Sequence, residues 1–167
     1  MKTTWTAGVL IGVLCGLWML VMGYSGWYKD PVMLNMFWMV ILIQIGCLVW
    51  GLRKTAGEGK QYWGQVGQGT LMSLIGAAII FVVSLLFTTV LFPNYFAELK
   101  SIQEEMLRNA GKSQAEITAT LNASASMQTP VVNALSGVIG TVVTGFVCSL
   151  IIGAFVRNKG GSDEAKV

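Results

Sequence analysis

Histidine is absent from this chain, and charged residues are scarce. None of the 167 residues is His, and Asp, Glu, Lys and Arg together make up only 11%, whereas a soluble domain carries about 25%. Histidine is a common ligand of metals and haem and the usual general base near neutral pH. The sequence therefore excludes a metal, haem or acid–base site that depends on a histidine of this chain. The formal charge of +3 is small and dispersed, so nucleic acid is not expected as a partner.

Charge is missing altogether from four long apolar runs. Hydrophobic residues make up 54% of the chain, and the runs at about 5–24, 32–52, 67–92 and 131–156 contain no Asp, Glu, Lys or Arg. A membrane-spanning helix needs about 20 such residues. The runs predict an all-α integral membrane protein, a four-transmembrane-helix bundle forming a single membrane domain over residues 1–167. Ionisable residues inside a span usually mark ion or proton pathways, so their absence argues against proton-coupled transport.

Prolines and charges mark the ends of these runs. Asp30-Pro31 precedes the second run, Pro93 follows the third, Pro130 opens the fourth and Arg157 closes it. Proline suits the first turn of a helix, where its missing N–H would have no partner. We therefore expect the helices to begin and end near these residues.

Lysine and arginine collect on the inner side of a membrane, which predicts the orientation of the chain. With the N-terminus inside, the inner segments carry Lys2, Arg53, Lys54, Lys60, Arg157, Lys159 and Lys166, and the outer segments carry Lys29, Lys100, Arg108 and Lys112. The larger set is the inner one. We expect a multi-pass protein with both termini inside, N-in and C-in.

The connection between the third and fourth runs, at about 94–127, is predicted to form a short helical insertion on the outer side. Asn94 can cap a helix, Gly111 can end it, and Ser113 and Glu116 have the spacing of a capping box that opens a second helix. The first helix has an apolar stripe formed by Phe96, Leu99, Ile102, Met106 and Ala110. We expect this stripe to lie on the outer leaflet or the bundle, with a partner-binding surface as the alternative.

Small residues recur at every fourth position in two of the runs. They are Gly8, Gly12 and Gly16 in the first run and Gly137, Thr141, Gly145, Ser149 and Gly153 in the fourth. A shorter series is Gly69, Ser73 and Ala77. Spacing of four places each series on one helix face, where small side chains let two backbones approach closely. These faces are predicted to pack helices together within one bundle, with self-association of chains as the alternative.

A few polar side chains lie inside the runs. Gln44 is the deepest amide, and Asn133 and Thr144 lie in the fourth run. Interhelical hydrogen bonds by such residues stabilise a bundle by about 1 kcal/mol each. We expect Gln44 to act in this way, and the three residues could alternatively line a polar pore or contact a solute.

No motif in the sequence indicates catalysis or a cofactor. The stretches Gly57–Gly59 and Gly64–Gly69 are glycine-rich, but neither follows a strand nor ends in the Lys-Ser/Thr of a phosphate-binding loop. We expect both to be flexible residues of the inner loop. Cys15, Cys47 and Cys148 are too far apart for a local metal motif and are expected to be small buried hydrophobes. We predict no catalytic residue, no cofactor and no metal site.

Four segments carry a resemblance to a known family. They are Tyr62-Trp63-Gly64-Gln65 before the third run, Phe92-Pro93-Asn94-Tyr95-Phe96 after it, Ser113-Gln114-Ala115-Glu116, and the end of the last run from Ser149 to Phe155. In these the chain resembles the DUF4199 type, a family of bacterial membrane proteins of unknown function. The resemblance implies a small four-span protein of the bacterial inner (cytoplasmic) membrane with a helical insertion outside it. It implies no catalytic residues.

These observations favour a function in assembly over a function in chemistry. The leading expectation is a non-catalytic structural or accessory inner-membrane protein, not an enzyme, that packs in the lipid bilayer in a homo-oligomer or with partners of a larger membrane complex. The alternative is a small oligomeric transporter or channel for a neutral or lipid-like solute.

Overall fold

The fold consists of helices joined by short turns over residues 1–156, the part of the chain that this computed structural model describes. The four long helices are α1 (Lys2–Tyr24), α2 (Met39–Ala56), α3 (Tyr62–Leu86) and α6 (Pro130–Val156), and the two shorter ones are α4 (Tyr95–Asn109) and α5 (Gln114–Ala125). Two 3-10 turns, η1 (Trp27–Lys29) and η2 (Met33–Trp38), precede α2, and a π-helical turn, η3 (Phe87–Leu91), extends α3. With these extensions, the four long helices are long and apolar enough to cross a membrane. The predicted all-α, four-helix membrane fold is confirmed.

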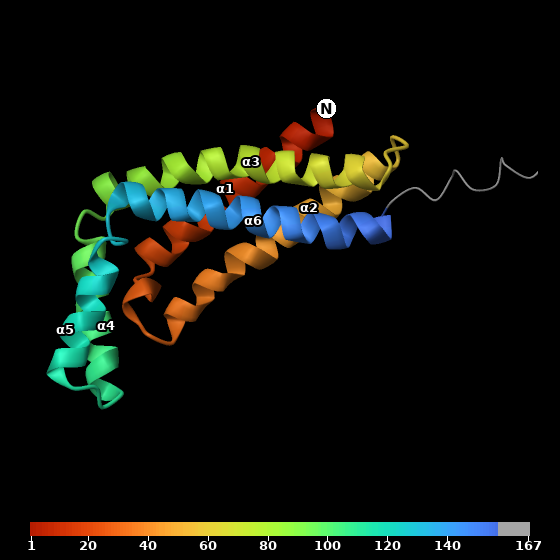
Figure 1. The fold of residues 1–167 in the computed structure, drawn as a ribbon. Coiled ribbons are helices and arrows are strands. Elements are labelled where there is room, and N and C mark those ends of the chain that lie inside the picture. Colours follow the sequence, from red (N-terminus) through yellow and green to blue (C-terminus); the bar gives the residue numbers. More distant parts are fainter. Residues whose placement is uncertain (157–167) are drawn as a thin grey trace, which may run out of the picture.

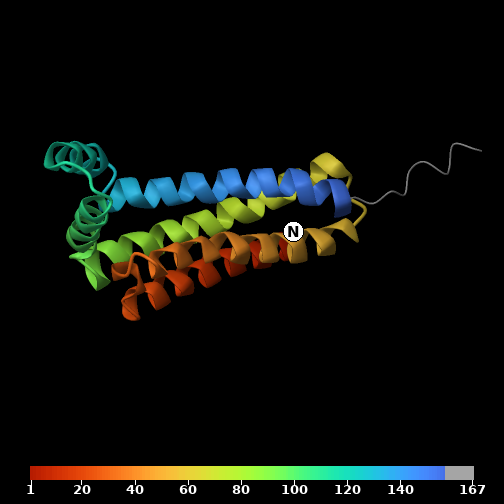
Figure 2. The ribbon, with the colours of Figure 1, turned by 90° about the horizontal axis from the view of Figure 1, so that it is seen from below.

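The long helices run along one another, and the shorter pair stands across one end of them (Figures 1 and 2). α3 packs against both α1 and α6, and α2 contacts all three of the other long helices. The buried core between them consists of Ala7, Ile11, Cys15, Leu48, Leu52, Met72 and Ile80, with Cys47 and Cys148 partly buried against it. We call the end that carries α4 and α5 the hairpin end of the bundle.

Glycines bring α1 and α3 into close contact. A Cβ atom built on Gly8 would lie 2.7 Å from Cβ of Ile75, and one on Gly12 would lie 2.6 Å from Cβ of Ile79. These distances are too short for two carbon atoms. Since lipid offers no hydrophobic force between helices, the close approach stabilises the pair through van der Waals contact. A Cβ on Gly16, the third member of this series, would lie 3.3 Å from the side chain of Val83. The small-residue face of α1 is thus occupied by α3 of the same chain.

The half of α6 that lies away from the hairpin end packs on α3 in the same manner. A Cβ on Gly145 would collide with the side chain of Ser73, and a Cβ on Gly69 would collide with that of Ser149. Ser149 is fully buried, and its hydroxyl donates a hydrogen bond of 2.6 Å to the carbonyl of Gly145. Gly153 faces the ring of Tyr62. The two helices therefore leave no room between them over this half of the bundle.

The prediction of a flexible loop over Gly64–Gly69 was wrong, because α3 begins at Tyr62 and includes these residues. Gln65 is fully buried, and its Oε1 accepts a hydrogen bond of 2.8 Å from Thr55 of α2. Tertiary contacts of this kind outweigh the cost of about 1 kcal/mol that a glycine adds to a helix interior. Only the other stretch, Gly57–Gly59, forms the turn, where Gly59 has a φ of 77°.

The second span also begins differently from the prediction. Pro31 lies in a turn, and the regular helix starts only at Met39, after the 3-10 segment η2. The carboxylate of Asp30 accepts hydrogen bonds from the backbone N–H groups of Val32 and Met33, at 2.8 and 3.3 Å. Asp30 thus caps this turn, and the proline does not occupy the first turn of α2. At the other end of the chain, α6 starts at Pro130 as predicted, whereas Arg157, Lys159 and Lys166 lie outside the described residues.

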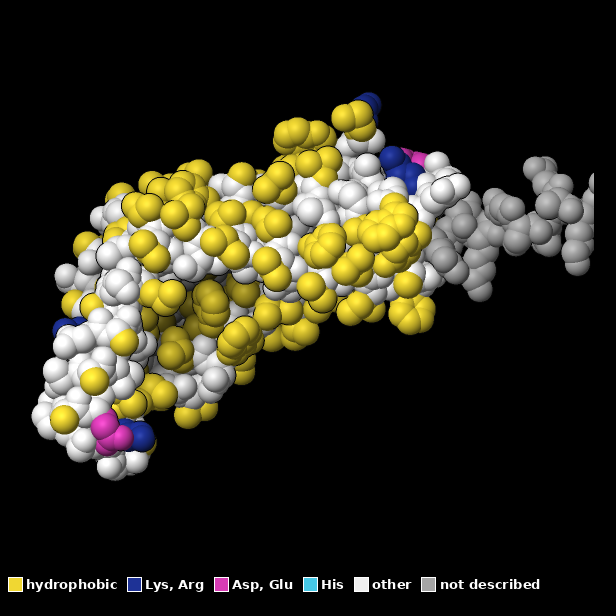
Figure 3. Space-filling model, viewed as in Figure 1, with side chains coloured by type: hydrophobic (Ala, Val, Ile, Leu, Met, Phe, Trp, Pro, Cys, Tyr) yellow, Lys and Arg dark blue, Asp and Glu magenta, His cyan; other side chains and the backbone are white. Residues whose placement is uncertain are grey.

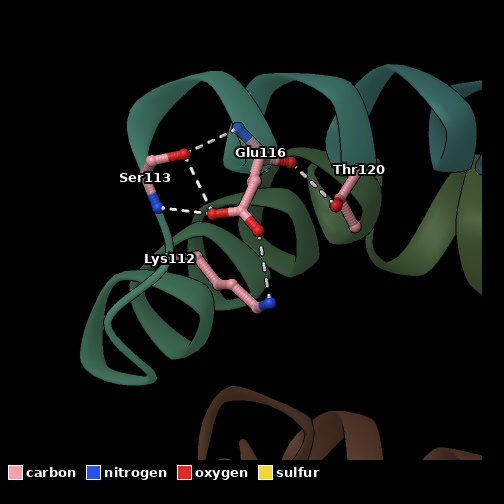
Figure 4. Close-up of polar contacts among 4 residues, drawn as sticks. All are labelled: Lys112, Ser113, Glu116 and Thr120. Carbon is pink, nitrogen blue, oxygen red and sulfur yellow. Dashed lines mark hydrogen bonds and ion pairs between the residues drawn. The ribbon is translucent and has the colours of Figure 1, made fainter.

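α4 and α5 form a hairpin with well-defined ends. The predicted capping box is confirmed (Figure 4): the Glu116 carboxylate accepts from the backbone N–H of Ser113 at 2.9 Å, and Ser113 Oγ accepts from the N–H of Glu116 at 3.4 Å. The Lys112 ammonium donates to the same carboxylate at 3.4 Å. These hydrogen bonds, the backbone one foremost, hold the pKa of Glu116 below its usual value. The hairpin therefore has a fixed turn between its helices.

The start of α4 departs from its predicted cap. Asn94 is the residue before the helix, but its side chain makes no capping hydrogen bond within the described residues. The helix is held instead by its contacts with η1 and with α5. Its apolar stripe divides accordingly, because Phe96, Leu99 and Ile102 are half-buried whereas Met106 and Ala110 are exposed.

Candidate functional site

A cavity of about 370 Å³ opens in the hairpin-end half of the bundle, between α2 and α6. Figure 3 shows the hollow below α6 and beside the hairpin. Apolar lining comes from Cys15, Met19, Phe37, Trp38, Val40, Ile41, Ile80 and Phe87. Polar lining comes from Gln44, Ser84, Thr88, Tyr95, Asn133, Ser136, Thr141 and Thr144, with Gly137 and Gly140 among them. We call this feature the α2–α6 cavity.

Gln44 forms the floor of the α2–α6 cavity. Its Nε2 donates hydrogen bonds to the carbonyl of Thr141, at 2.7 Å, and to Oγ of Ser73, at 3.4 Å. The side chain is 4% exposed. Immediately beyond it, the contact of Gly145 with Ser73 closes the space between α6 and α3. The cavity therefore ends at the middle of the bundle and does not pass through it.

The wall formed by α3 and α6 carries a second set of polar contacts nearer the hairpin. Nδ2 of Asn133 lies 3.4 Å from Oγ of Ser84. The hydroxyl of Thr88 donates to the carbonyl of Ser84 at 2.9 Å. Ser84 and Thr88 are 4% and 3% exposed, whereas Asn133 is half-buried. The polar side chains of Ser84, Thr88 and Asn133 thus lie at the part of the cavity nearest the hairpin, and the amide of Asn133 links α6 to α3 there.

The start of the hairpin forms the rim of the cavity. The ring of Tyr95 lines it and lies 5.4 Å from the ring of Phe87 and 5.2 Å from that of Tyr28. Burial raises the pKa of Tyr95 above its usual value. Its hydroxyl therefore remains protonated and able to donate a hydrogen bond near neutral pH.

An ionic contact holds the hairpin to the bundle beside this rim. The Tyr28 hydroxyl and the Lys29 ammonium both donate to the carboxylate of Glu98, at 2.5 and 3.1 Å. Hydrogen bonds from these two groups lower the pKa of Glu98, and the same carboxylate raises the pKa of Lys29. The pKa of Tyr28 is raised, first by burial and then by its bond to Glu98. At neutral pH the positive and negative charges at this point therefore neutralise one another.

The structure brings together the three polar residues singled out in the sequence. Gln44, Asn133 and Thr144 all line the α2–α6 cavity, with Gln44 at its floor and Asn133 nearer the hairpin. The small-residue series of α6 divides at the same place. Gly145, Ser149 and Gly153 pack on α3, whereas Gly137 and Thr141 line the cavity, and a Cβ on Gly137 would meet nothing within 4 Å. The series of α1, Gly8, Gly12 and Gly16, lies wholly against α3.

Several lining residues were missed in the sequence. Ser136 and Gly140 lie on the same face of α6 as Asn133 and Thr144, at spacings of three and four. A helical stripe of polar and small residues beside the packing series was the available signal. Tyr95 gave no such signal, because only the hairpin geometry places it at the rim.

The chemistry that this arrangement supports is binding. Every lining side chain is apolar, a neutral amide, a hydroxyl or a thiol, and the thiol of Cys15 lies 3.7 Å from the carbonyl of Val40. Among residues 1–156 no cluster of His, Cys, Asp or Glu has the arrangement of a metal site. The cavity offers hydrogen-bonding groups in an apolar surround, which is typical of sites for small apolar ligands.

Comparison with known proteins identifies the family. No curated protein and no solved structure matches the chain. The model of DUF4199, described as a protein of unknown function, matches residues 6–158. This chain therefore belongs to the DUF4199 family.

Proposed function

We propose that this chain is a non-catalytic accessory protein of the bacterial inner membrane that acts in a homo-oligomer or a larger membrane complex. The observation that carries the proposal is the α4–α5 hairpin, which stands out from the four-helix bundle (Figure 1). An ordered projection of this kind presents a surface to another protein, whereas the bundle anchors it in the bilayer.

Buried side chains and a hydrogen bond hold the α4–α5 hairpin in one conformation. Ile117 and Leu121 of α5 are buried, at 1% and 8% exposure, and α5 packs on α4. Gln128 donates to Gln103 at 2.8 Å and so ties the end of the hairpin to its first helix. Isolated helices of this length are marginal in water, so these contacts are needed for a defined surface. Met106 remains 42% exposed on it.

The packing faces within the membrane favour the hairpin as the point of association. Gly8 and Gly12 are occupied by α3, and Gly145 by α3 and α2, all within one chain. A second chain cannot use these faces without opening the bundle. Association through them, the alternative raised by the sequence, is therefore disfavoured.

We further propose the N-in, C-in orientation, which places the hairpin outside the cytoplasm. Arg53 and Lys54 end α2 at the end of the bundle opposite the hairpin, and cations are favoured at that inner side. The hairpin itself carries both signs of charge, in the pairs Arg108–Glu104 and Lys112–Glu116. Such a mixed surface has little effect on orientation.

Site-specific crosslinking of the full chain tests the hairpin. A photoreactive amino acid replaces Met106 in one variant and, as a matched control, Val82 in another, since Val82 is 55% exposed on the lipid-facing side of α3. After illumination in intact cells, we expect a protein adduct from position 106 and none from position 82. Equal yields of protein adduct at the two positions, or none at either, would contradict the proposal.

A second function, transport of a neutral or lipid-like solute, is favoured by the α2–α6 cavity. Because the cavity stops at Gln44, a path across the membrane would require several chains or a movement of α6 away from α2. Flux of a neutral solute into proteoliposomes, measured for the wild type and for Gln44→Leu, tests this alternative. Flux that the substitution leaves unaltered would remove Gln44 from the path.

A further inference from the structure

We propose that the α2–α6 cavity binds an uncharged lipid that carries a hydroxyl group and enters sideways from the bilayer leaflet at the hairpin end. The inference concerns a binding site in a single chain, and it holds whether or not the protein transports anything or joins a complex.

The place of the cavity fits a lipid. On α6 it extends from Asn133 to Thr144, which at 1.5 Å per residue is about 16 Å. The hydrocarbon core of a bilayer is about 30 Å thick, so the cavity is as deep as one leaflet. Ser136, Gly137 and Gly140 are exposed along its edge. The opening therefore faces the hydrocarbon of the leaflet, so that lipid molecules can enter the cavity from the side.

The charges around the cavity exclude an ionic headgroup from its interior. No Lys, Arg, Asp or Glu among residues 1–156 lines it, and a charge placed in such a site without a partner is very costly. Outside the rim, Lys29 and Glu98 are already paired with each other at 3.1 Å. A neutral molecule thus fits the cavity better than a phospholipid headgroup or a fatty carboxylate.

The side-chain amide of Gln44 indicates that the ligand carries a hydroxyl group. The carbonyl of Thr141 can only accept a hydrogen bond, so the atom of Gln44 that faces it at 2.7 Å must be the nitrogen. The other amide atom, Oε1, accepts no hydrogen bond from residues 1–156, although the side chain is 4% exposed and lines the cavity. Within residues 1–156 the one fully buried side-chain polar atom without a partner is Nε2 of Gln65, so Oε1 of Gln44 is accessible from the cavity and free to accept. The hydroxyl of a lipid would donate to this oxygen at the floor of the cavity.

Hydroxyls on α6 offer further contacts to the same ligand. Thr70, Thr88 and Ser149 each donate to a backbone carbonyl four residues earlier in their own helix. Ser136 and Thr144 make no such bond within the part of the chain that the structure describes. Their hydroxyls remain available at the cavity wall.

Photolabelling of the full chain in phosphatidylcholine nanodiscs tests the proposal. The probe is a long-chain alcohol with a photoreactive group on its chain, and the comparison probe is the alkane of the same length and photoreactive group. We expect the alcohol to label peptides of α2 and α6 that line the cavity, in a manner that unlabelled alcohol displaces. The alcohol should label them about fivefold more than the alkane, the factor that one hydrogen bond in a membrane protein contributes. In Gln44→Leu this preference should fall to near one.

Two glycine variants separate the cavity from general contact with lipid. A Cβ on Gly140 and a Cβ on Gly46 would both meet nothing within 4 Å, but only Gly140 lines the cavity. Gly140→Leu should fill the cavity and lower alcohol labelling about tenfold, whereas Gly46→Leu should leave it unchanged. Ser136→Leu is a second filling variant in case the first unfolds. Labelling that survives both filling variants, equal labelling by alcohol and alkane in the wild type, or a chain-to-chain crosslink across this face would overturn the proposal.

Discussion

The close packing of α1 on α3 makes a quantitative prediction for single methyl groups. In Gly8→Ala the new Cβ would lie 2.7 Å from Cβ of Ile75 and 2.8 Å from the backbone oxygen of Met72. Neither neighbour is the end of a flexible side chain, so the helices must move apart. Overpacking of this kind costs about 1–3 kcal/mol, and alanine gives back at most about 1 kcal/mol of helix propensity. We expect a net loss of up to about 2 kcal/mol.

Two other glycine-to-alanine substitutions in the bundle serve as matched controls for Gly8→Ala. In Gly16→Ala the nearest atoms are Val83 methyl groups at 3.3 Å, which can rotate away, so we expect a loss below about 1 kcal/mol. In Gly46→Ala nothing lies within 4 Å, and we expect no loss. The free energy of unfolding, measured for the full chain by denaturant titration in detergent micelles, should fall in the order Gly46, Gly16, Gly8. Equal stability of the three variants would refute the packing argument.

Three further predictions concern the hairpin end. The bond between Lys29 and Glu98 should stabilise the docked hairpin between the ordinary pKa values of 4.5 and 10.5. Because the pKa of Glu98 is lowered in the folded protein, this stability is lost as pH falls through that folded-state pKa, below 4.5. Because the pKa of Lys29 is raised, the stability is also lost as pH rises through its folded-state pKa, above 10.5. Amide exchange of α4 measured across pH reports both losses, and Glu98→Gln should abolish the loss at acid pH. Ser113→Ala should lower the local stability of α5 by about 1 kcal/mol, seen as faster amide exchange in its first turn; unchanged exchange would argue against the cap. A cysteine at Ser101 should react with a membrane-impermeant thiol reagent added outside cells and one at Gly57 should not, and the reverse pattern would contradict the N-in orientation.

The helical architecture could be predicted from the sequence because its signals are local. Each span is an unbroken apolar run, and Pro130 opens α6 as a proline in a first turn should. The capping box of Ser113 and Glu116 was predictable for the same reason, since both partners lie within one turn. Such features depend on residues a few positions apart, which a sequence displays directly.

Two of the failures come from contacts between distant residues. The stretch Gly64–Gly69 has the composition of a loop, but burial of Gln65 against Thr55 and of Gly69 against Ser149 makes it part of α3. Asn94 has the right residue type for a cap, yet contacts of α4 with η1 hold that helix in place. Local propensity was outweighed in both cases by tertiary packing.

Three polar residues of the candidate site were predictable from the sequence, but its shape was not. Gln44, Asn133 and Thr144 stand out as polar residues in apolar runs. That they share one cavity depends on the separation of α2 from α6 at the hairpin end and on its closure where Gly145 meets Ser73. Neither feature has a period or motif in the sequence.

The mass of the particle purified from native membranes tests the proposed function most directly. Native mass spectrometry in a mild detergent would compare the full-length protein with its single-chain mass of 18.0 kDa. We predict a mass above that of one chain, from further copies or from a co-purifying partner. A particle of 18.0 kDa with no other chain bound would contradict the account.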